Sequence, residues 1–336
     1  MTDSAAILDR LVLLARGYRS TQAVYVMAKL GLADHMADGP ATAEELSRKV
    51  GVDALSLGRV LRLAAFCGLV AEVPGDRFEL TELGSPLRTG VEGSLRAFGV
   101  MLGEEHYAAW GSLLYSVQTA KPAFEHVYGA PFFDYMSTHP DAQATFDAAM
   151  SAGVDVMMNG LAQAFDYSRA RVLVDVGGGN GSLAATVLKE HPGLEAVIYD
   201  QEHVLQAADA YLTEAGVRAR CRLVPGNFFE SVPAGGDVYL LSNIVHDWDD
   251  DRSLRILENC RAAMSAEGVV LLVEIVMPEH GKATAAAMDD VNMLVLLTGR
   301  ERTEKEYRSL LGEAGLSLQK VTRLTARESV IEARPV

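Results

Sequence analysis

The sequence has few of the features that mark a secreted or membrane-spanning protein. It contains only three cysteines, Cys67, Cys221 and Cys260, which lie far apart and lack metal-ligand spacing. We therefore expect reduced thiols and no structural metal. The N-terminal segment has no apolar core with a small-residue cleavage site, and no stretch approaches the roughly 18 apolar residues of a membrane span. A cytoplasmic protein without a membrane partner is expected.

Basic residues are also scarce. The chain has 30 Lys and Arg residues against 45 Asp and Glu residues, which gives a formal net charge of −15. Because binding to a phosphate backbone requires basic surface, nucleic acid is not an expected partner. A small molecule is the expected one. At 336 residues, the chain is long enough for about two domains of roughly 100–200 residues each.

The first 95 residues have the pattern of a small helical domain. Apolar residues recur at helical spacing through residues 5–38, and a new helix begins near Thr42, where carboxylates fill the first turn. A further amphipathic helix covers residues 56–66, and apolar runs at 70–73 and 78–80 flank a Gly-Asp turn. This is a winged-helix order. Because its surface is acidic, dimerisation is favoured over DNA binding.

Residues 96–165 are predicted to be helical and are rich in methionine and aromatic side chains. Such side chains usually pack in a core, but clusters of them also line pockets for flat apolar ligands. The candidates for a pocket in this region are Trp110, Phe133, Met150 and Met157.

Strand-length apolar runs alternate with helical segments from residue 166 to the end. Apolar strands separated by helices are typical of a parallel sheet covered on both faces, so this part is predicted to be a doubly wound, Rossmann-like α/β domain. The predicted strands are 172–176, 195–199, 221–224, 237–241, 269–274, 316–321 and 329–333.

A glycine loop follows the first of these strands. Gly177, Gly179 and Gly181 give the spacing G-x-G-x-G directly before a predicted helix, with Asp175 on the strand. Glycines at this place let the backbone approach a ligand closely. The dinucleotide spacing G-x-G-x-x-G is not met because residue 182 is Ser, which disfavours a dehydrogenase.

Three further strand ends carry polar or aromatic side chains. Asp200 ends the second strand, where a carboxylate can accept hydrogen bonds from both ribose hydroxyls of a nucleoside. Asn227 and Phe228 follow the third strand, where an adenine-contacting loop would lie. His246 follows the fourth strand, and a neutral imidazole there can take a proton from an acceptor hydroxyl. By itself, such a histidine is more often a satisfied surface group.

Taken together, these motifs resemble those of the S-adenosylmethionine-dependent O-methyltransferases of plant phenolic and bacterial antibiotic or polyketide pathways, a homodimeric family with an N-terminal winged-helix dimerisation domain. The resemblance runs from residues 18–35 to the last strand. It implies that His246 is the general base and that Glu274 and Glu301 flank it. It also places Asp247 at the acceptor. The implied contacts to S-adenosylmethionine are Asp175, Gly177, Gly179, Asp200, Gln201, Asn227, Phe228 and Ser242.

The sequence departs from the family at two cofactor positions. Gln201–Glu202 replace the usual Leu-Pro, and Asn227 replaces an acid. Asn292 and Met288 are expected to join the acceptor pocket, and Asp249–Asp251 are expected to cap the next helix. The expected reaction is methyl transfer to a hydroxyl of a small aromatic or polyketide-like molecule. Three alternatives stay open: an N- or C-methyltransferase, a relative that binds the cofactor but catalyses hydroxylation or decarboxylation, and a metabolite-sensing regulator.

Overall fold

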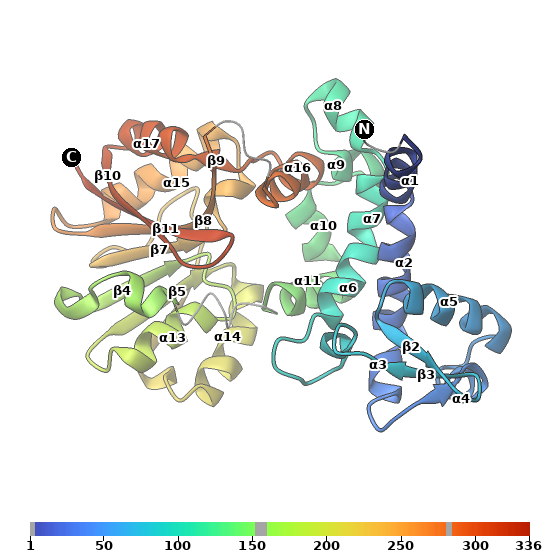
Figure 1. Ribbon diagram of the computed structural model, residues 1–336. Coiled ribbons are helices and arrows are strands. Elements are labelled where there is room, and N and C mark those ends of the chain that lie inside the picture. The colour runs from blue at the N-terminus through green and yellow to red at the C-terminus, as the bar shows by residue number, and fades with distance from the viewer. Residues whose placement is uncertain (1–3, 152–159, 280–283) are drawn as a thin grey trace. The chain divides into compact units, whose positions relative to one another are not determined.

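The computed structural model describes residues 4–151, 160–279 and 284–336 (Figure 1). Contacts divide the chain into two compact units. The helical unit comprises Met1–Gly111 and Phe133–Gly153, and the α/β unit comprises Ser112–Phe132 and Val154–Val336. Among the described residues, no helix is long and apolar enough to cross a membrane.

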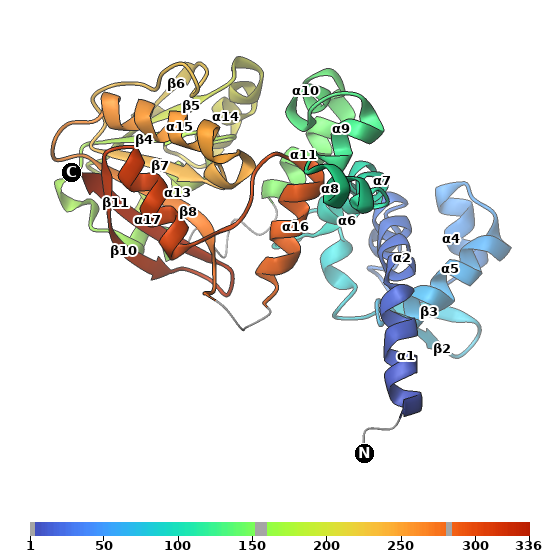
Figure 2. The same ribbon diagram turned by 90° about the horizontal axis from the view of Figure 1, so that it is seen from above.

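The helical unit has the predicted winged-helix elements. Its helices are α1 (Ser4–Ala15), α2 (Gly17–Lys29), α3 (Leu32–His35), α4 (Ala43–Val50), α5 (Ala54–Phe66), η1 (Ser85–Leu87), α6 (Arg96–Gly103), α7 (Glu105–Trp110), α10 (Phe132–Thr138) and α11 (Pro140–Ser151). Its strands are β1 (Ala41–Thr42), β2 (Val70–Val73) and β3 (Arg77–Leu80), which pair in the order β1-β3-β2. Figure 2 shows α1 projecting beyond the rest of this unit.

Local sequence explains why these helices begin where they do. The Thr42 side chain accepts a hydrogen bond from the Glu45 backbone N–H, and the Glu45 carboxylate accepts one from the Thr42 N–H. This reciprocal capping box starts α4, and Asp53 caps α5. Residues 5–38, expected to be helical, contain three helices. Gly31, at a φ of 61°, separates α2 from α3.

The α/β unit has the alternation of strands and helices that the sequence predicts. Its helices are α8 (Leu113–Thr119), α9 (Ala123–Tyr128), η2 (Tyr167–Arg169), α13 (Ser182–Glu190), α14 (Glu202–Glu214), η3 (Arg218–Arg220), η4 (Val245–Asp247), α15 (Asp250–Ala263), α16 (Ala286–Leu296) and α17 (Glu304–Glu313). Its strands are β4 (Val172–Val176), β5 (Glu195–Asp200), β6 (Cys221–Pro225), β7 (Val238–Ser242), β8 (Val269–Met277), β9 (Arg302–Thr303), β10 (Leu316–Arg323) and β11 (Glu328–Pro335).

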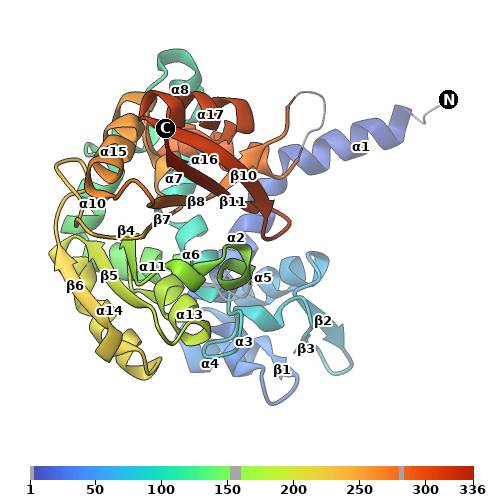
Figure 3. The same cartoon turned by 90° about the vertical axis from the view of Figure 1, so that its left-hand side faces the viewer.

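One eight-stranded sheet forms the centre of this unit, with the order β10-β11-β8-β7-β4-β5-β6 and β9 paired to β8. Alternate residues of the strands enter two separate cores. Leu173 and Leu240 pack with α13 and α14, whereas Val174 and Leu241 pack with α15 and α17. Figure 3 shows these two pairs of helices on opposite faces of the sheet. Burial on both faces explains the continuous apolar runs of the sequence.

The last two strands differ from the predicted parallel sheet. β10 pairs antiparallel with β11, and β11 pairs antiparallel with β8. Only four residues join β10 to β11, which is too short for the crossover that a parallel pair requires. The strand order reverses between β4 and β7. In open α/β sheets, the ligand crevice lies at such a reversal, outside the carboxyl ends of the strands.

Candidate functional site

The glycine loop at the carboxyl end of β4 has a backbone that other residues would not adopt. Gly177, Gly179 and Gly181 have φ angles of 70°, 57° and 76°. A Cβ atom on Gly177 would lie 2.4 Å from Cδ1 of Ile244, so a larger residue would have to displace that side chain and adopt a strained backbone. At Gly179, a Cβ atom would meet nothing within 4 Å. The loop therefore presents open backbone at Gly179, directly before α13.

Asp200 joins this loop to the end of β5. Its Oδ2 atom accepts a hydrogen bond of 2.9 Å from the Gly179 N–H, and its Oδ1 atom accepts one of 2.7 Å from the Gln201 N–H. Asp175 lies beneath the loop and is buried. Burial raises the pKa of Asp175 to about 7, and the charge of Asp200 adds to this effect. Asp200 therefore holds the loop by hydrogen bonds, and Asp175 packs against it, since its Cγ atom lies 2.8 Å from where a Cβ atom on Gly178 would be.

The other cofactor candidates lie on neighbouring strand ends. Phe228 lies beside the glycine loop, since its Cε1 atom is 3.8 Å from where a Cβ atom on Gly177 would be. The side-chain Oδ1 atom of Asn227 accepts a hydrogen bond of 3.0 Å from the Phe229 N–H, so this side chain caps its own turn. Ser242 Oγ is buried and has no hydrogen-bond partner within the described part of the chain.

His246 lies in η4, the short turn that follows β7, and its side chain is 11% exposed. Nδ1 of the ring is 2.9 Å from Oε1 of Glu301 and 3.4 Å from Oε2 of Glu274. Nε2 is 3.4 Å from Oδ1 of Asp247. The structure thus brings together the predicted base and all three carboxylates.

Backbone contacts hold the two glutamates that face Nδ1. Glu274, in the middle of β8, is fully buried, and its Oε1 atom accepts a hydrogen bond of 2.9 Å from the Val245 N–H. Glu301 precedes β9, and its own N–H donates a hydrogen bond of 3.0 Å to Asp290 of α16. The carboxylates therefore come from different elements and converge on one ring nitrogen.

The charges of this cluster shift its protonation. Burial alone would lower the pKa of His246, but the carboxylates of Glu274, Glu301 and Asp247 outweigh it and raise the pKa to about 10. Burial raises the pKa of Glu274 and that of Asp247 to about 7, against the opposing charge of His246. The imidazole is therefore a stronger base than an ordinary histidine.

His246, Glu274 and Glu301 each offer one ligand atom, and these atoms all lie within 4.8 Å of one another. A metal ion could be held by such a set. The hydrogen bond between Nδ1 and Glu301 accounts for this proximity without an ion.

The predicted acceptor residues are divided between the units. Trp110, Phe133 and Met150 belong to the helical unit, and Met150 is 44% exposed. Met288 and Asn292 lie on α16 of the α/β unit, where Met288 is 70% exposed. Met157 lies outside the described residues.

Sequence reasoning missed two residues that contact η4. A Cβ atom on Gly299 would lie 1.8 Å from the His246 carbonyl oxygen, so η4 packs directly on this glycine. Arg302 is fully buried and contacts the same turn. Both residues belong to the segment Gly-Arg-Glu-Arg-Thr. The signal in the sequence that could have identified Arg302 is an arginine close to a buried strand, because a charged side chain is rarely buried unless it is paired.

Two family models match the chain: an O-methyltransferase domain over residues 110–317 and an O-methyltransferase dimerisation domain over residues 12–90. A phenazine O-methyltransferase from Lysobacter antibioticus is 42% identical over 97% of this chain and 96% of that protein. The chain belongs to the O-methyltransferase family. The cofactor of this methyltransferase is S-adenosylmethionine. The glycine loop, Asp200 and the unpartnered Ser242 hydroxyl fit a nucleoside-bearing group of this kind.

Two further relatives show the range of the family. A phenazine-1-carboxylate N-methyltransferase from Pseudomonas aeruginosa is 33% identical over 96% of each chain. An O-methyltransferase from neocarzinostatin biosynthesis, solved with S-adenosylmethionine and 2-hydroxy-5-methyl naphthoic acid, has a TM-score of 0.85. The two chains are 32% identical, and the matched region covers 95% of this chain and 96% of the neocarzinostatin enzyme. The family therefore includes methylation of nitrogen as well as of oxygen.

Proposed function

We propose that this enzyme methylates a hydroxyl group of a small aromatic or polyketide-like natural product and that His246 is the general base. The observation that carries the proposal is the 2.9 Å contact between His246 Nδ1 and Glu301. This contact holds the proton of a neutral imidazole on Nδ1, which leaves the Nε2 lone pair to accept the acceptor's proton.

In this reaction the chain has to position the reactants and to remove a proton from the acceptor. S-adenosylmethionine supplies a methyl group that is already activated as a sulfonium. The remaining tasks are positioning, worth up to roughly 7–11 kcal/mol, and removal of a proton from a hydroxyl with a pKa near 10. The carboxylates around His246 raise its pKa to about 10, so proton transfer from a phenol is nearly balanced. Asp200, Gln201, Asn227, Phe228 and Ser242 would hold the cofactor beside the glycine loop.

The acceptor pocket is assigned to Asp247, Asn292, Met288, Trp110, Phe133, Met150 and Met157. The aromatic compounds in the names of the relatives support an aromatic acceptor for this enzyme. The assembly is a homodimer built on the dimerisation domain. Exposed leucines of α1 favour it, since Leu11 is 62% and Leu14 is 70% exposed. We assign residues 1–95 to dimerisation, 96–165 to the acceptor pocket, 166–336 to catalysis, and the protein to the cytoplasm.

The test is transfer of a labelled methyl group from S-adenosylmethionine to a panel of hydroxylated phenazines, naphthoates and quinones, each beside its amino analogue. We expect label on oxygen and a rate loss of roughly 10²–10⁴-fold in His246→Ala. His203→Ala is the matched control, because this exposed histidine on α14 lies in the same unit. Label only on nitrogen or carbon, or transfer that is indifferent to His246, would overturn the proposal.

A further inference from the structure

Arg302 is a fully buried cation near the site. It lies on β9, its relative exposure is 0%, and it directly follows Glu301 in the chain. A buried guanidinium is costly unless its donors are satisfied. The acceptors of its hydrogen bonds therefore indicate the role of the residue.

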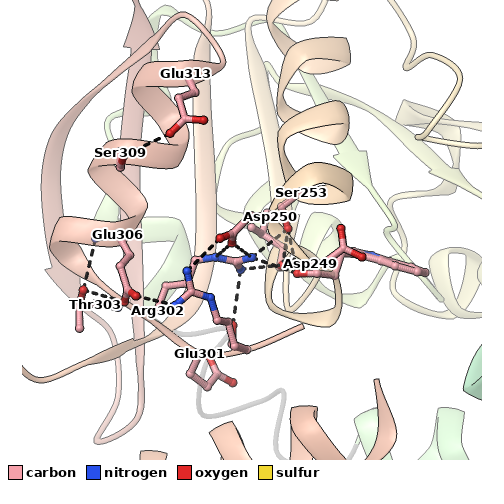
Figure 4. A network of polar contacts seen from close by, with 12 residues as sticks. Asp249, Asp250, Ser253, Glu301, Arg302, Thr303, Glu306, Ser309 and Glu313 are labelled. Carbon is pink, nitrogen blue, oxygen red and sulfur yellow. Dashed lines mark hydrogen bonds and ion pairs between the residues drawn. The ribbon is translucent and has the colours of Figure 1, made fainter. Parts of the chain in front are cut away.

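Figure 4 shows Arg302 close to Asp250 and Ser253, and further donors reach both sides of the turn that carries His246. Nη1 donates a hydrogen bond of 3.0 Å to the Val245 carbonyl oxygen, and Nη2 donates one of 3.0 Å to the Trp248 carbonyl oxygen. These carbonyls belong to the residue before His246 and to the residue after Asp247. The guanidinium thus spans the turn.

Two polar groups of α15 complete the contact. Oδ1 of Asp250 lies 2.7 Å from Nη2 and 3.0 Å from Nε of Arg302. The Ser253 hydroxyl accepts a hydrogen bond of 3.2 Å from Nη2 and itself lies within 3.1 Å of the Val245 and Trp248 carbonyl oxygens. The turn is therefore held through its carbonyls on one side and through Glu274 and the Val245 N–H on the other.

We propose that Arg302 is a positioning residue whose guanidinium fixes the backbone of η4, so that the ring of His246 stays on Glu301. The proposal rests on the proposed role of His246 as base. A planar fork with several fixed donors can span two carbonyls and a carboxylate at once, which a lysine ammonium cannot do. Displacement of a catalytic group by about 1 Å can reduce a rate by roughly 10²-fold.

Arg300 provides a matched control. It lies on the other side of Glu301 and contacts Asp250 and Glu306, so it shares the Asp250 partner with Arg302. Its side chain is 45% exposed, and no hydrogen bond from it to the η4 backbone is found among the described residues. Arg300→Met therefore removes a charge near the site without freeing the turn.

The decisive experiment is histidine-selective NMR of the full-length protein bound to S-adenosylhomocysteine, with the His246 signal assigned through His246→Ala. It needs no acceptor, so its outcome is independent of whether methyl transfer to a hydroxyl is found. Asp247, Glu274 and Glu301 face the ring, Asp290 contacts the backbone of Glu301, and Arg302 is the cation of this cluster. Removing that cation alone would raise the His246 pKa, whereas loosening the ring from Glu301 would lower it.

We expect the titration midpoint of His246 to fall by about one pH unit or more in Arg302→Met and in Arg302→Lys, and to stay unchanged in Arg300→Met. Once an acceptor is known, kcat should fall roughly 10–100-fold in both Arg302 variants with the KM for S-adenosylmethionine within about twofold. A midpoint that rises or does not move would overturn the proposal. If Arg302→Met fails to fold, Arg302→Lys decides, because it keeps the charge.

Discussion

Nδ1 of His246 lies 2.9 Å from Oε1 of Glu301, although 55 positions separate the two residues in the chain. Both groups are buried, and the bond fixes which ring nitrogen carries the proton. In the tautomer that results, Nε2, which lies 3.4 Å from Oδ1 of Asp247, carries the lone pair that a base requires.

Glu301→Gln should therefore reduce methyl transfer. The amide keeps the shape of the side chain but lacks the charge that raises the His246 pKa. We expect kcat/KM to fall at least about tenfold, with binding of S-adenosylmethionine little changed. Glu304→Gln is the control, because Glu304 lies on the same segment, is half exposed and pairs only with Arg308 among the described residues. Equal activity of the two variants would contradict this account.

The pH dependence of the rate follows from the same cluster. A base must be unprotonated to act, and the surrounding carboxylates raise the pKa of His246 to about 10. We expect kcat/KM to rise from neutral to alkaline pH, since the fraction of neutral imidazole rises over that range. In His246→Ala, where only ionisation of the acceptor remains, the rise should follow the pKa of the acceptor and shift when a more acidic acceptor is used. A rate that falls above pH 8 in the folded wild type would contradict the assignment.

The sequence predicts most strands of the sheet and the position of the glycine loop, for physical reasons. Strands buried on both faces read as apolar runs, so β4 to β8 are visible in the sequence. The glycine loop is visible because Gly177 and Gly179 adopt a backbone that other residues avoid. By contrast, the antiparallel pairing of β10 and β11 depends on the short connection between them, which residue patterns do not specify.

The contacts that hold the base in place are harder to predict. Asp290, Gly299 and Arg302 all act on η4 or Glu301 through backbone atoms. A contact to a backbone atom does not require a particular residue type at the position that supplies this atom, so the sequence does not reveal the contact. The segment Gly-Arg-Glu-Arg-Thr identified Glu301, but only the folded chain shows that the neighbouring arginine spans the turn.

Gly299→Ala tests how closely the site is packed. The added Cβ atom would lie 1.8 Å from the His246 carbonyl oxygen and 2.4 Å from the Asp247 carbonyl carbon, so the turn has to move. We expect a loss of about 1–3 kcal/mol in stability and a fall in kcat of roughly 10-fold or more. Gly312→Ala is the control, because a Cβ atom there meets nothing within 4 Å. Thermal unfolding and steady-state kinetics would measure both effects, and a fully active Gly299→Ala enzyme would be inconsistent with this packing.

Asp200→Ala should weaken cofactor binding. The variant loses the carboxylate that accepts hydrogen bonds from the Gly179 and Gln201 N–H groups, so Gly179 is no longer fixed to the end of β5. We expect the Kd for S-adenosylhomocysteine to rise at least about tenfold by calorimetry. Asp209→Ala is the control, since this half-exposed residue of α14 pairs with Arg218. An unchanged Kd in Asp200→Ala would remove Asp200 from the cofactor site.

The central claim is that His246 removes the proton of the acceptor hydroxyl. The most direct measurement compares wild type with His246→Gln on fluorinated analogues of an accepted phenol, whose pKa values run downward from about 10 toward the assay pH. We predict a loss of roughly 10²–10⁴-fold for the least acidic analogue, shrinking steadily as the analogues ionise without help. The same loss for every analogue would contradict the claim, because it would show that His246 contributes position or packing and takes no proton.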